Sequence, residues 1–253
     1  MKPLEKLVWI NREIPSSCDL SVYIPCLNEE RNVAETLTTL ITICDQMQIT
    51  FELIVVDDAS TDGTIRVAQQ VQEKYPDKNI RIVSNQKRRG LARNFVDVSY
   101  IANGRYYMLV CGDNAEPPES YRAILERMGE ADMVIPIFLE KDQRSKFRRE
   151  LSRVFTRVVN LISGNDIGYY NGPTLHRRSN VMRWHADTDC FAYQAEIITR
   201  LIQEGATYLQ VKVENRDRLH GNSKAINFKN FLGVTHSLVQ IGLRRLRKWM
   251  FQT

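Results

Sequence analysis

Strand signals and helix signals alternate along the first half of the chain, and this alternation constrains the fold more than any other feature. Runs of β-branched, aromatic and aliphatic residues predict strands at residues 20–25, 51–56, 80–84, 106–111 and 133–138. Apolar residues at helical spacing predict helices at residues 32–47, 64–75, 91–103 and 120–129. Strands alternating with helices predict an α/β fold with a mostly parallel, doubly wound central sheet. Gly104 stands where a glycine would end the third helix.

The second half of the chain is less regular. We expect a basic amphipathic helix at residues 141–162, a helix at 191–204, a strand at 208–213 and a closing helix or helix pair at 228–251. No linker rich in Pro, Gly or Ser and no internal repeat divides the chain. We therefore predict one domain over residues 1–227, followed by a basic, amphipathic helical tail over residues 228–253.

Composition excludes several classes of protein. The chain has 253 residues, 43% of them hydrophobic, and 35 Lys and Arg against 30 Asp and Glu give a net charge of +5. The apolar content excludes a disordered or collagen-like chain, and the modest charge argues against a nucleic-acid partner. Five widely spaced cysteines without a CxxC pair predict reduced thiols and a cytoplasmic location. We expect neither a secretory signal nor a membrane-spanning helix.

Acidic and amide side chains follow three of the predicted strands, at residues 25–30, 57–64 and 112–118. The carboxyl ends of parallel strands meet at one edge of a sheet, where ligands of open α/β sheets bind. Carboxylates crowded at such an edge suit a cation or the hydroxyl and N–H groups of a ligand. Asn28, Asp58 and Asp62 alternatively serve as helix caps. The three loops together favour a nucleotide–sugar or metal–phosphate site.

Six segments, taken together, resemble a known family. They are IPCLNEE (24–30), ELIVVDDASTDGT (52–64), RGLARN (89–94), CGDNAEPPES (111–120), FAYQAE (191–196) and RDRLHGNSK (216–224). In order and spacing they resemble family 2 glycosyltransferases, and within these the dolichol-phosphate and polyprenyl-phosphate sugar synthases. The resemblance implies a GT-A fold, with a Rossmann-like, mostly parallel central sheet flanked by helices. It also implies an inverting transfer of sugar from a nucleotide-diphosphate sugar.

The resemblance assigns donor-binding roles to particular residues. The set implied for the nucleotide-sugar comprises Pro25, Asn28, Glu29, Asp58, Arg93, Asn94, Arg218, Ser223 and Lys224. The first four surround the base and ribose, and Arg93 and Asn94 flank the nucleotide. Arg218, Ser223 and Lys224 clamp the diphosphate, where positive charge balances the leaving group. Alternatively, Arg93 is a solvent-exposed charged residue on a helix. The segment at 216–224 is alternatively a solvent-exposed basic loop.

The metal-binding motif departs from the family pattern. The usual pair of aspartates that binds Mg²⁺ or Mn²⁺ falls on Cys111 and Asp113, and a further family glutamine falls on Ala115. Only Asp113 keeps the family residue, although Glu116 is a neighbouring oxygen donor. Hard cations bind one or two carboxylates together with phosphates and water. We therefore expect Mg²⁺ or Mn²⁺ to bind at Asp113 and Glu116.

A further segment bears on the acceptor side of the site. In the synthases a Phe-x-x-Gln-x-Glu segment borders this site, which implies catalytic roles for Gln194 and Glu196 beside Asp113. Both side chains alternatively satisfy backbone N–H groups at a helix start. A lipid-phosphate acceptor is already ionised, whereas a sugar hydroxyl benefits from a general base, for which Asp187 and Asp189 are candidates.

Another departure bears on the acceptor. Thr174 stands where many synthases carry an arginine that faces the acceptor phosphate, and we expect His176 to be a packed strand residue. The predicted acceptor is a polyprenyl phosphate. The alternatives are a saccharide hydroxyl in surface glycan synthesis, or a non-catalytic protein that binds a nucleotide-sugar.

The helices at 141–162 and 228–251 both combine apolar residues with Lys and Arg. On the first, the apolar residues are Phe147, Leu151, Val154, Phe155, Val158 and Leu161. This composition suits a helix lying on an anionic membrane leaflet, which would place a cytoplasmic protein peripherally on the membrane. A helix covering the core or an oligomer contact remains the alternative.

Overall fold

The computed structural model describes residues 14–138, 146–184, 186, 190–214 and 228–251. In this part of the chain a seven-stranded sheet runs in the order β3-β2-β1-β4-β6-β5-β7. Its strands are β1 (Cys18–Cys26), β2 (Phe51–Asp57), β3 (Asn79–Ser84), β4 (Gly104–Leu109), β5 (Met133–Phe138), β6 (Leu175–Arg177) and β7 (Tyr208–Val213). All pairs are parallel except those of β6 with β4 and β5. The predicted mostly parallel α/β sheet is confirmed.

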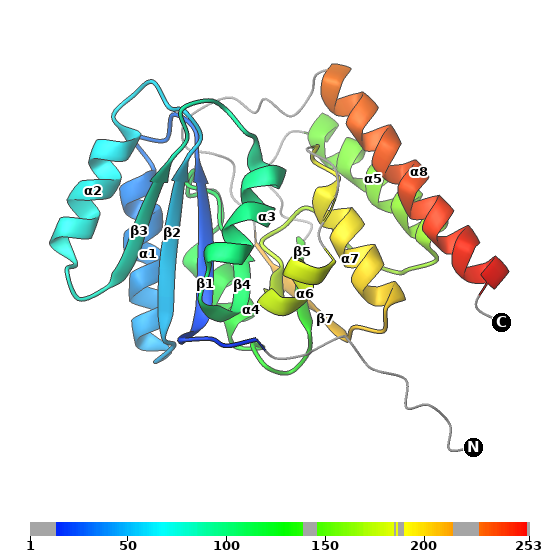
Figure 1. Cartoon of the computed structure of the whole chain (residues 1–253), viewed down its shortest axis with the longest axis horizontal. Coiled ribbons are helices and arrows are strands. Elements are labelled where there is room, and N and C mark those ends of the chain that lie inside the picture. Colours follow the sequence, from blue (N-terminus) through cyan, green and yellow to red (C-terminus); the bar gives the residue numbers. More distant parts are fainter. Residues whose placement is uncertain (1–13, 139–145, 185, 187–189, 215–227, 252–253) are drawn as a thin grey trace.

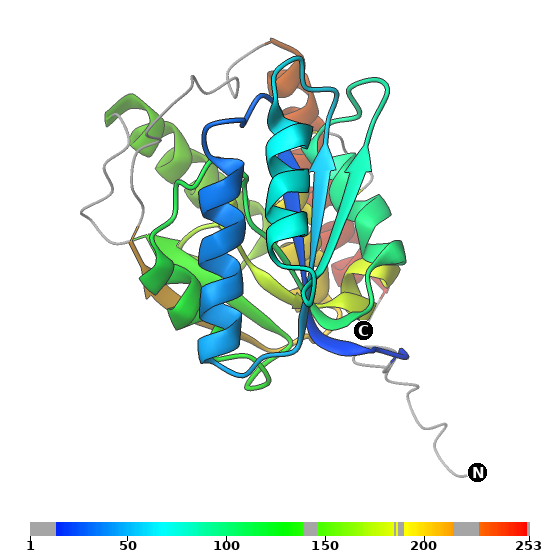
Figure 2. The ribbon, with the colours of Figure 1, turned by 90° about the vertical axis from the view of Figure 1, so that its left-hand side faces the viewer.

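Helices cover both faces of the sheet. Helices α1 (Val33–Gln46), α2 (Thr64–Lys74) and α4 (Pro118–Leu125) contribute to one core. Helices α3 (Leu91–Ile101), α6 (Arg178–Arg183) and α7 (Tyr193–Gln203) contribute to the other. Outside α7, helices α5 (Lys146–Ser163) and α8 (Phe228–Phe251) lie side by side (Figure 1). Figure 2 shows α1 and α2 in front of the sheet.

The strands are apolar because both faces of the sheet are covered. Val22 and Ile24 of β1 pack in the core with α1, whereas Tyr23 packs in the core with α3. A strand buried on both faces reads as a continuous apolar run, and this is why the strands were visible in the sequence.

The bounds of β6 and the helix α6 were not predicted, although His176 was expected in a strand, and one residue was assigned wrongly. Strand β6 has three residues, and α6 has six, so neither is long enough for a periodic pattern. The prediction that Gly104 ends α3 is wrong, because α3 ends at Ile101 and Gly104 begins β4. A Cβ atom at Gly104 would lie 2.3 Å from the backbone nitrogen of Ser21. The glycine therefore permits the close approach of β4 to β1.

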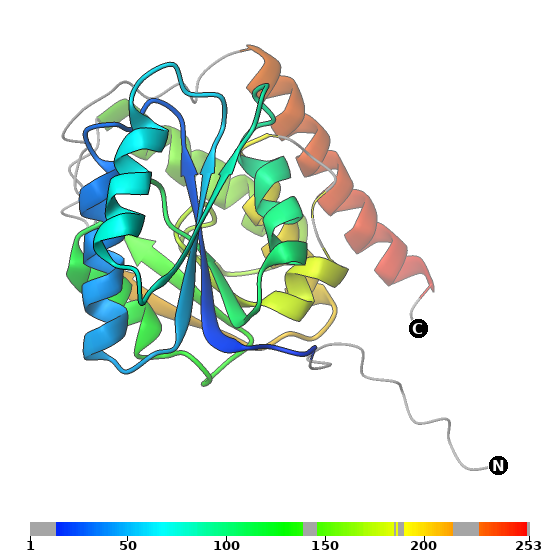
Figure 3. The same ribbon diagram turned by 60° about the vertical axis from the view of Figure 1, so that its left-hand side comes forward.

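The closing segment is one continuous helix of 24 residues, not a pair. It packs against α5 and α7 on the outside of the molecule (Figures 1 and 3). Among the residues that the structure describes, no helix has the length and apolar character needed to cross a membrane. The division between a domain at 1–227 and a tail at 228–253 stays a prediction.

Candidate functional site

Backbone hydrogen bonds join the loops at the carboxyl edge of the sheet. The Asp58 N–H donates to the Cys26 carbonyl at 2.9 Å, and the Gly112 N–H donates to the Pro25 carbonyl at 3.1 Å. The Asn85 N–H donates to the Asp57 carbonyl at 2.9 Å. The loops that follow β1, β2, β3 and β4 therefore converge, as the strand directions predicted, and Figure 3 shows them at one end of the sheet.

The loops after β1 and β2 also share side-chain hydrogen bonds. The exposed Asn28, in the left-handed region at φ 60°, accepts from the Thr61 N–H at 2.8 Å. The Glu29 N–H donates to Thr64 Oγ1 at 2.9 Å, and the Asn32 side chain donates to the Glu29 carboxylate at 2.8 Å. Asn28 thus holds two loops together, and the alternative that it caps a helix is wrong, because Asn32 occupies that position.

Asp62 does act at a helix start. Its Oδ1 accepts from the Thr64 N–H at 3.0 Å, beside the Gly63 N-cap of α2. Asp58 does not cap α2, and its side chain turns to a different loop. None of the three residues is therefore an N-cap residue, and of the three only Asp62 bonds a backbone N–H at a helix start.

Asp58 is the most heavily bonded carboxylate of this edge. Its Oδ1 accepts from the Arg89 N–H at 2.8 Å, from Asn85 Nδ2 at 2.9 Å and from Asn94 Nδ2 at 3.0 Å. Its Oδ2 accepts from the Gly90 N–H at 2.9 Å. Burial raises the pKa of Asp58, but these hydrogen bonds outweigh burial and leave the pKa below its ordinary value. The carboxylate therefore stays ionised and fixes the loop that leads into α3.

Asn85 was not singled out from the sequence. It directly follows the strand at 80–84 and carries no recognisable motif, so its position at a strand end was the one available signal. Its side chain donates to Asp58 and also to Asn94 Oδ1 at 3.1 Å. Asp58, Asn85 and Asn94 form one buried to half-buried polar cluster.

The loop after β4 carries the predicted metal ligands. Asp113 is only 3% exposed, and its Oδ1 accepts from the Ala115 N–H at 3.3 Å. Glu116 accepts from the Tyr121 hydroxyl at 3.1 Å. Burial, and next the charge of Glu116, raise the pKa of Tyr121 well above its ordinary value, so its hydroxyl remains a donor.

The oxygen ligands that this loop offers determine how it could bind the expected cation. Within the described ranges, no group of three or more His, Cys, Asp or Glu side chains could hold a metal ion unaided. Two carboxylates on one loop fit Mg²⁺ or Mn²⁺ when phosphate oxygens and water complete the coordination. Asp113 and Glu116 would then serve together with a bound diphosphate.

Gln194 and Glu196 lie in buried contacts on α7. Gln194 Oε1 lies 3.2 Å from His176 Nε2 of β6, and burial lowers the pKa of His176 to about 4. The neutral imidazole therefore donates to the amide, and the expectation that His176 is a packed strand residue is confirmed. Glu196 pairs with Arg244 of α8 at 3.3 Å and accepts from the Ser237 hydroxyl at 3.3 Å.

The remaining predicted residues are placed as follows. Pro25 is half-buried near the end of β1, Asn94 is buried at the start of α3, and Arg93 is exposed on α3. Arg218, Ser223, Lys224, Asp187 and Asp189 lie outside the described residues. Cys111, at the first position of the departed metal motif, is half-buried.

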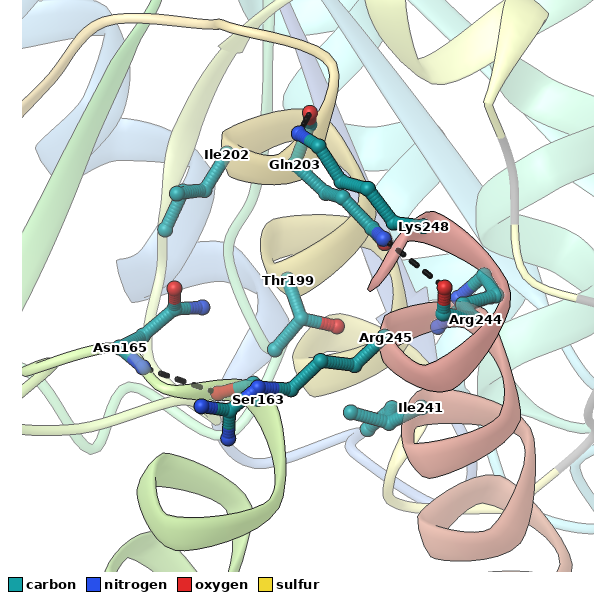
Figure 4. A pocket seen from close by; sticks show the side chains of 9 residues that line it. All are labelled: Ser163, Asn165, Thr199, Ile202, Gln203, Ile241, Arg244, Arg245 and Lys248. Atoms are coloured by element: carbon teal, nitrogen blue, oxygen red, sulfur yellow. Dashed lines mark hydrogen bonds between the residues drawn. The ribbon is translucent and has the colours of Figure 1, made fainter. Parts of the chain in front are cut away.

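A cavity of about 290 Å³ lies away from this edge, between α7, α8 and the end of α5 (Figure 4). Its lining includes Arg244, Arg245 and Lys248. Lys248 Nζ donates to the Gln203 carbonyl at 2.7 Å, and Arg245 Nη1 donates to the Leu161 and Ile162 carbonyls. These cations bind the carboxyl ends of α7 and α5, where the helix dipole favours positive charge. The cavity thus lies at the attachment of α8.

A family model for glycosyl transferase family 2 matches residues 21–198, which include the loops after β1, β2, β3 and β4. The chain belongs to glycosyl transferase family 2. The match runs from within β1 to within α7, so the resemblance in the sequence is confirmed.

Curated relatives are more specific but distant. The chain is 23% identical over 205 residues to an undecaprenyl-phosphate 4-deoxy-4-formamido-L-arabinose transferase of Edwardsiella ictaluri, which covers 81% of this chain and 62% of the relative. A Salmonella choleraesuis protein of the same name is 23% identical over 225 residues, which covers 87% of this chain and 66% of that relative. The chain therefore spans about two thirds of the length of these relatives.

Solved structures show the same fold. Glucosyl-3-phosphoglycerate synthase from Mycobacterium tuberculosis, solved with Mn²⁺, UDP and glucosyl-3-phosphoglycerate, matches with a TM-score of 0.65 and 16% identity. That match covers 90% of this chain and 80% of the synthase. Mannosyl-3-phosphoglycerate synthase from Rubrobacter xylanophilus matches with a TM-score of 0.65 and 16% identity, covering 91% and 74% of the two chains. The predicted GT-A glycosyltransferase fold is confirmed.

Proposed function

We propose that this chain transfers a sugar, with inversion, from a nucleotide-diphosphate sugar to a polyprenyl phosphate. The observation that carries the proposal is the convergence of the loops after β1, β2 and β4, in a member of glycosyl transferase family 2. The name of the curated relatives supports the acceptor, because it specifies undecaprenyl phosphate.

The donor would bind at the carboxyl edge. Pro25, Asn28, Glu29 and Asp58 surround the proposed nucleotide position from the loops after β1 and β2. Asp58 already accepts four hydrogen bonds, and these fix the loop at Asn85–Gly90. To bind Asp58, N–H groups of the nucleotide would have to replace some of these protein N–H groups. Arg93 and Asn94 would flank the nucleotide from α3, with Arg218, Ser223 and Lys224 on the diphosphate.

The chemistry needs one displacement. An oxygen of the acceptor phosphate attacks the anomeric carbon, a new carbon–oxygen bond forms, and the bond to the nucleoside diphosphate breaks on the opposite side. The acceptor phosphate is already ionised, so no general base is needed. A bound Mg²⁺ or Mn²⁺ at Asp113 and Glu116 would neutralise charge on the leaving diphosphate.

The structure bears on Gln194 and Glu196 through their partners. Gln194 contacts His176 in the core, and Glu196 contacts Arg244 and Ser237 of α8. Among the described hydrogen bonds, neither side chain accepts from a backbone N–H at the start of α7, as the alternative role required. Their partners lie on β6 and α8, and these contacts support a role in positioning α7.

A donor screen tests the proposal. The full chain is incubated with UDP-, GDP-, CDP- and dTDP-sugars, with Mn²⁺ or Mg²⁺, and release of nucleoside diphosphate is measured. Undecaprenyl phosphate is then compared with a saccharide acceptor and with 3-phosphoglycerate. Faster release with undecaprenyl phosphate is expected. Donor binding without turnover on any acceptor would favour a non-catalytic nucleotide-sugar-binding protein.

A further inference from the structure

Exposed apolar side chains gather on the helix pair α5 and α8. Of the fourteen large apolar side chains that are exposed in the described part of the chain, four lie on α5 and seven on α8. Exposure reaches 79% at Leu161 on α5 and 77% at Trp249 on α8. Single exposed apolar residues are common, but a contiguous set marks an interaction surface.

These residues form one stripe along each helix. On α8 the stripe consists of Leu232, Val239, Leu243, Leu246 and Met250, and on α5 of Phe147, Leu151, Val154 and Leu161. The separations are three, four or seven residues, which keeps each stripe on one side of its helix. We call these two stripes together the outer face.

The outer face points away from the core. On α8, Val239 and Leu243 each lie two residues after a core-facing residue, Ser237 and Ile241, and two residues turn a helix by about 200°. On α5, Leu161 likewise lies two residues after the buried Val159. Val159 and Ile241 belong to the same hydrophobic core, so both stripes face away from that core.

The two helices are held to each other as one surface. Arg245 of α8 donates to the Leu161 carbonyl at 2.9 Å and to the Ile162 carbonyl at 3.0 Å. Gly242 lies so close to Ile162 that an added Cβ atom would be 3.3 Å from its Cγ2. Figure 1 shows α5 and α8 running side by side along the outside of the molecule.

The charge of the two helices indicates the partner. Helix α5 carries five Lys and Arg against one Glu, and α8 carries five Lys and Arg with no acidic residue. Arg153, Arg157 and Arg247 are exposed beside the apolar stripes. A second copy of this chain would bring like charges together, whereas an anionic surface complements them. Exposed Trp and Phe with flanking Lys and Arg are typical of interfacial helices.

We propose that the outer face of α5 and α8 binds the surface of a bilayer that contains anionic phospholipids. The apolar stripes enter the boundary between headgroups and acyl chains, and the flanking arginines contact the lipid phosphates. In Figures 1 and 3 the N-terminal ends of both helices lie toward the end of the molecule where β1 and β2 finish. Binding in this way would hold the carboxyl edge of the sheet near the bilayer.

Flotation with vesicles tests this surface. The full chain is mixed, without donor or acceptor, with vesicles of phosphatidylcholine alone or of equal parts phosphatidylcholine and phosphatidylglycerol. Flotation only with the anionic vesicles, weakened by salt, is expected. The double variant Leu151→Glu with Leu243→Glu should lose binding at least about tenfold, since binding scales with buried apolar area. The double variant Arg157→Gln with Arg247→Gln should lose about fivefold for each removed cation.

Matched controls make the result specific. Ile101→Glu changes an exposed apolar residue on α3, and Lys74→Gln with Arg127→Gln removes the same charge elsewhere; both should float like the wild type. Circular dichroism confirms that each variant is folded. Equal flotation of all variants, or none by the wild type, overturns the proposal. The proposal is also overturned if the wild type is a dimer in solution, and if Leu151→Glu with Leu243→Glu makes it monomeric but leaves flotation unchanged. Because no substrate is present, failure here leaves the donor screen unaffected.

Discussion

The carboxyl edge of the sheet and the outer face of α5 and α8 depart from the usual distribution of side chains in opposite directions. At the edge, the acidic side chains of Asp58 and Asp113 are buried. On the outer face, Leu161 and Leu243 are exposed although they are apolar. Carboxylates are rarely buried without partners, and large apolar patches are rarely left in water.

The two departures are stabilised differently. Asp58 is compensated inside the chain, by four hydrogen bonds from the loop at Asn85–Gly90 and from α3. In the part of the chain that the structure describes, no residue covers the outer face in this way, because its stripes lie opposite the residues that contact the core. Substitutions at the edge should therefore change stability and activity, whereas substitutions on the outer face should change association alone.

The largest effect is expected at Asp113. Asp113→Asn keeps the shape of the side chain but removes the carboxylate proposed to hold the cation, so turnover of the nucleotide-sugar should fall by about 10²–10³-fold. Release of nucleoside diphosphate with Mn²⁺ measures this. Asp19→Asn, on the opposite end of β1, is the control. Unchanged turnover in Asp113→Asn would remove this loop from the catalytic site.

Asp58→Ala should lower the free energy of unfolding by about 3 kcal/mol, because it leaves the side-chain amides of the half-buried Asn85 and the buried Asn94, and the N–H groups of Arg89 and Gly90, without their acceptor. Urea unfolding followed by circular dichroism checks the value. The pKa of Asp58 is lowered in the folded state, so its contribution is present above its unfolded pKa and is lost as pH falls through the folded pKa. Asp58→Asn should show a weaker loss of stability in acid than the wild type.

Protonation of His176 should lower the free energy of unfolding by a similar amount as the pH falls. Its pKa is lowered from 6.5 to about 4 by burial, so the unfolded chain binds the proton more readily. Stability should be complete above the unfolded pKa and fall by roughly 3 kcal/mol as pH drops from 6.5 to 4. His176→Gln cannot titrate, and its unfolding free energy should change less over this range. A wild type with constant stability between these pH values contradicts the burial of a neutral imidazole.

Arg244→Met should destabilise the chain by about 2 kcal/mol, since it leaves the buried Glu196 without its cation. This destabilisation is smaller than for a fully buried ion pair, because the Arg244 side chain is 21% exposed and solvent screens the pair. Glu196→Gln with Arg244→Met should recover part of the loss. If Glu196 acts only through α8, Glu196→Gln will keep most of its turnover, and a loss of about a hundredfold without loss of stability would assign it to catalysis.

The smallest effect on stability is expected on the outer face. Leu151→Glu and Leu243→Glu should each change the free energy of unfolding by less than about 0.5 kcal/mol, because surface substitutions break no buried contact. Thermal unfolding in the absence of vesicles measures this. A loss of several kcal/mol would mean that the stripes are packed in solution, and the contrast with the carboxyl edge would disappear.

Much of the first half could be predicted because local pattern and tertiary role agree. Strand β5 matches its expected range of 133–138, and β3 begins one residue before its expected start. The convergence of the three polar loops also followed, since parallel strands end at one edge. Asn85 was missed because its role depends on Asp58, which is 27 residues away in the sequence. Its own sequence context indicates only a loop.

The amphipathic helices α5 and α8 show most clearly what the sequence alone could not predict. The sequence by itself determined an α/β sheet with polar loops after its strands, and two basic helices with apolar residues. It could not determine which apolar residues would be buried, because a helix presents several sides and only its neighbours select one. The tertiary structure placed Val159 and Ile241 against the core and left Leu161 and Leu243 outside. Likewise, only folding brought Arg244 to Glu196 and Asn85 to Asp58, because these contacts join residues far apart in the chain.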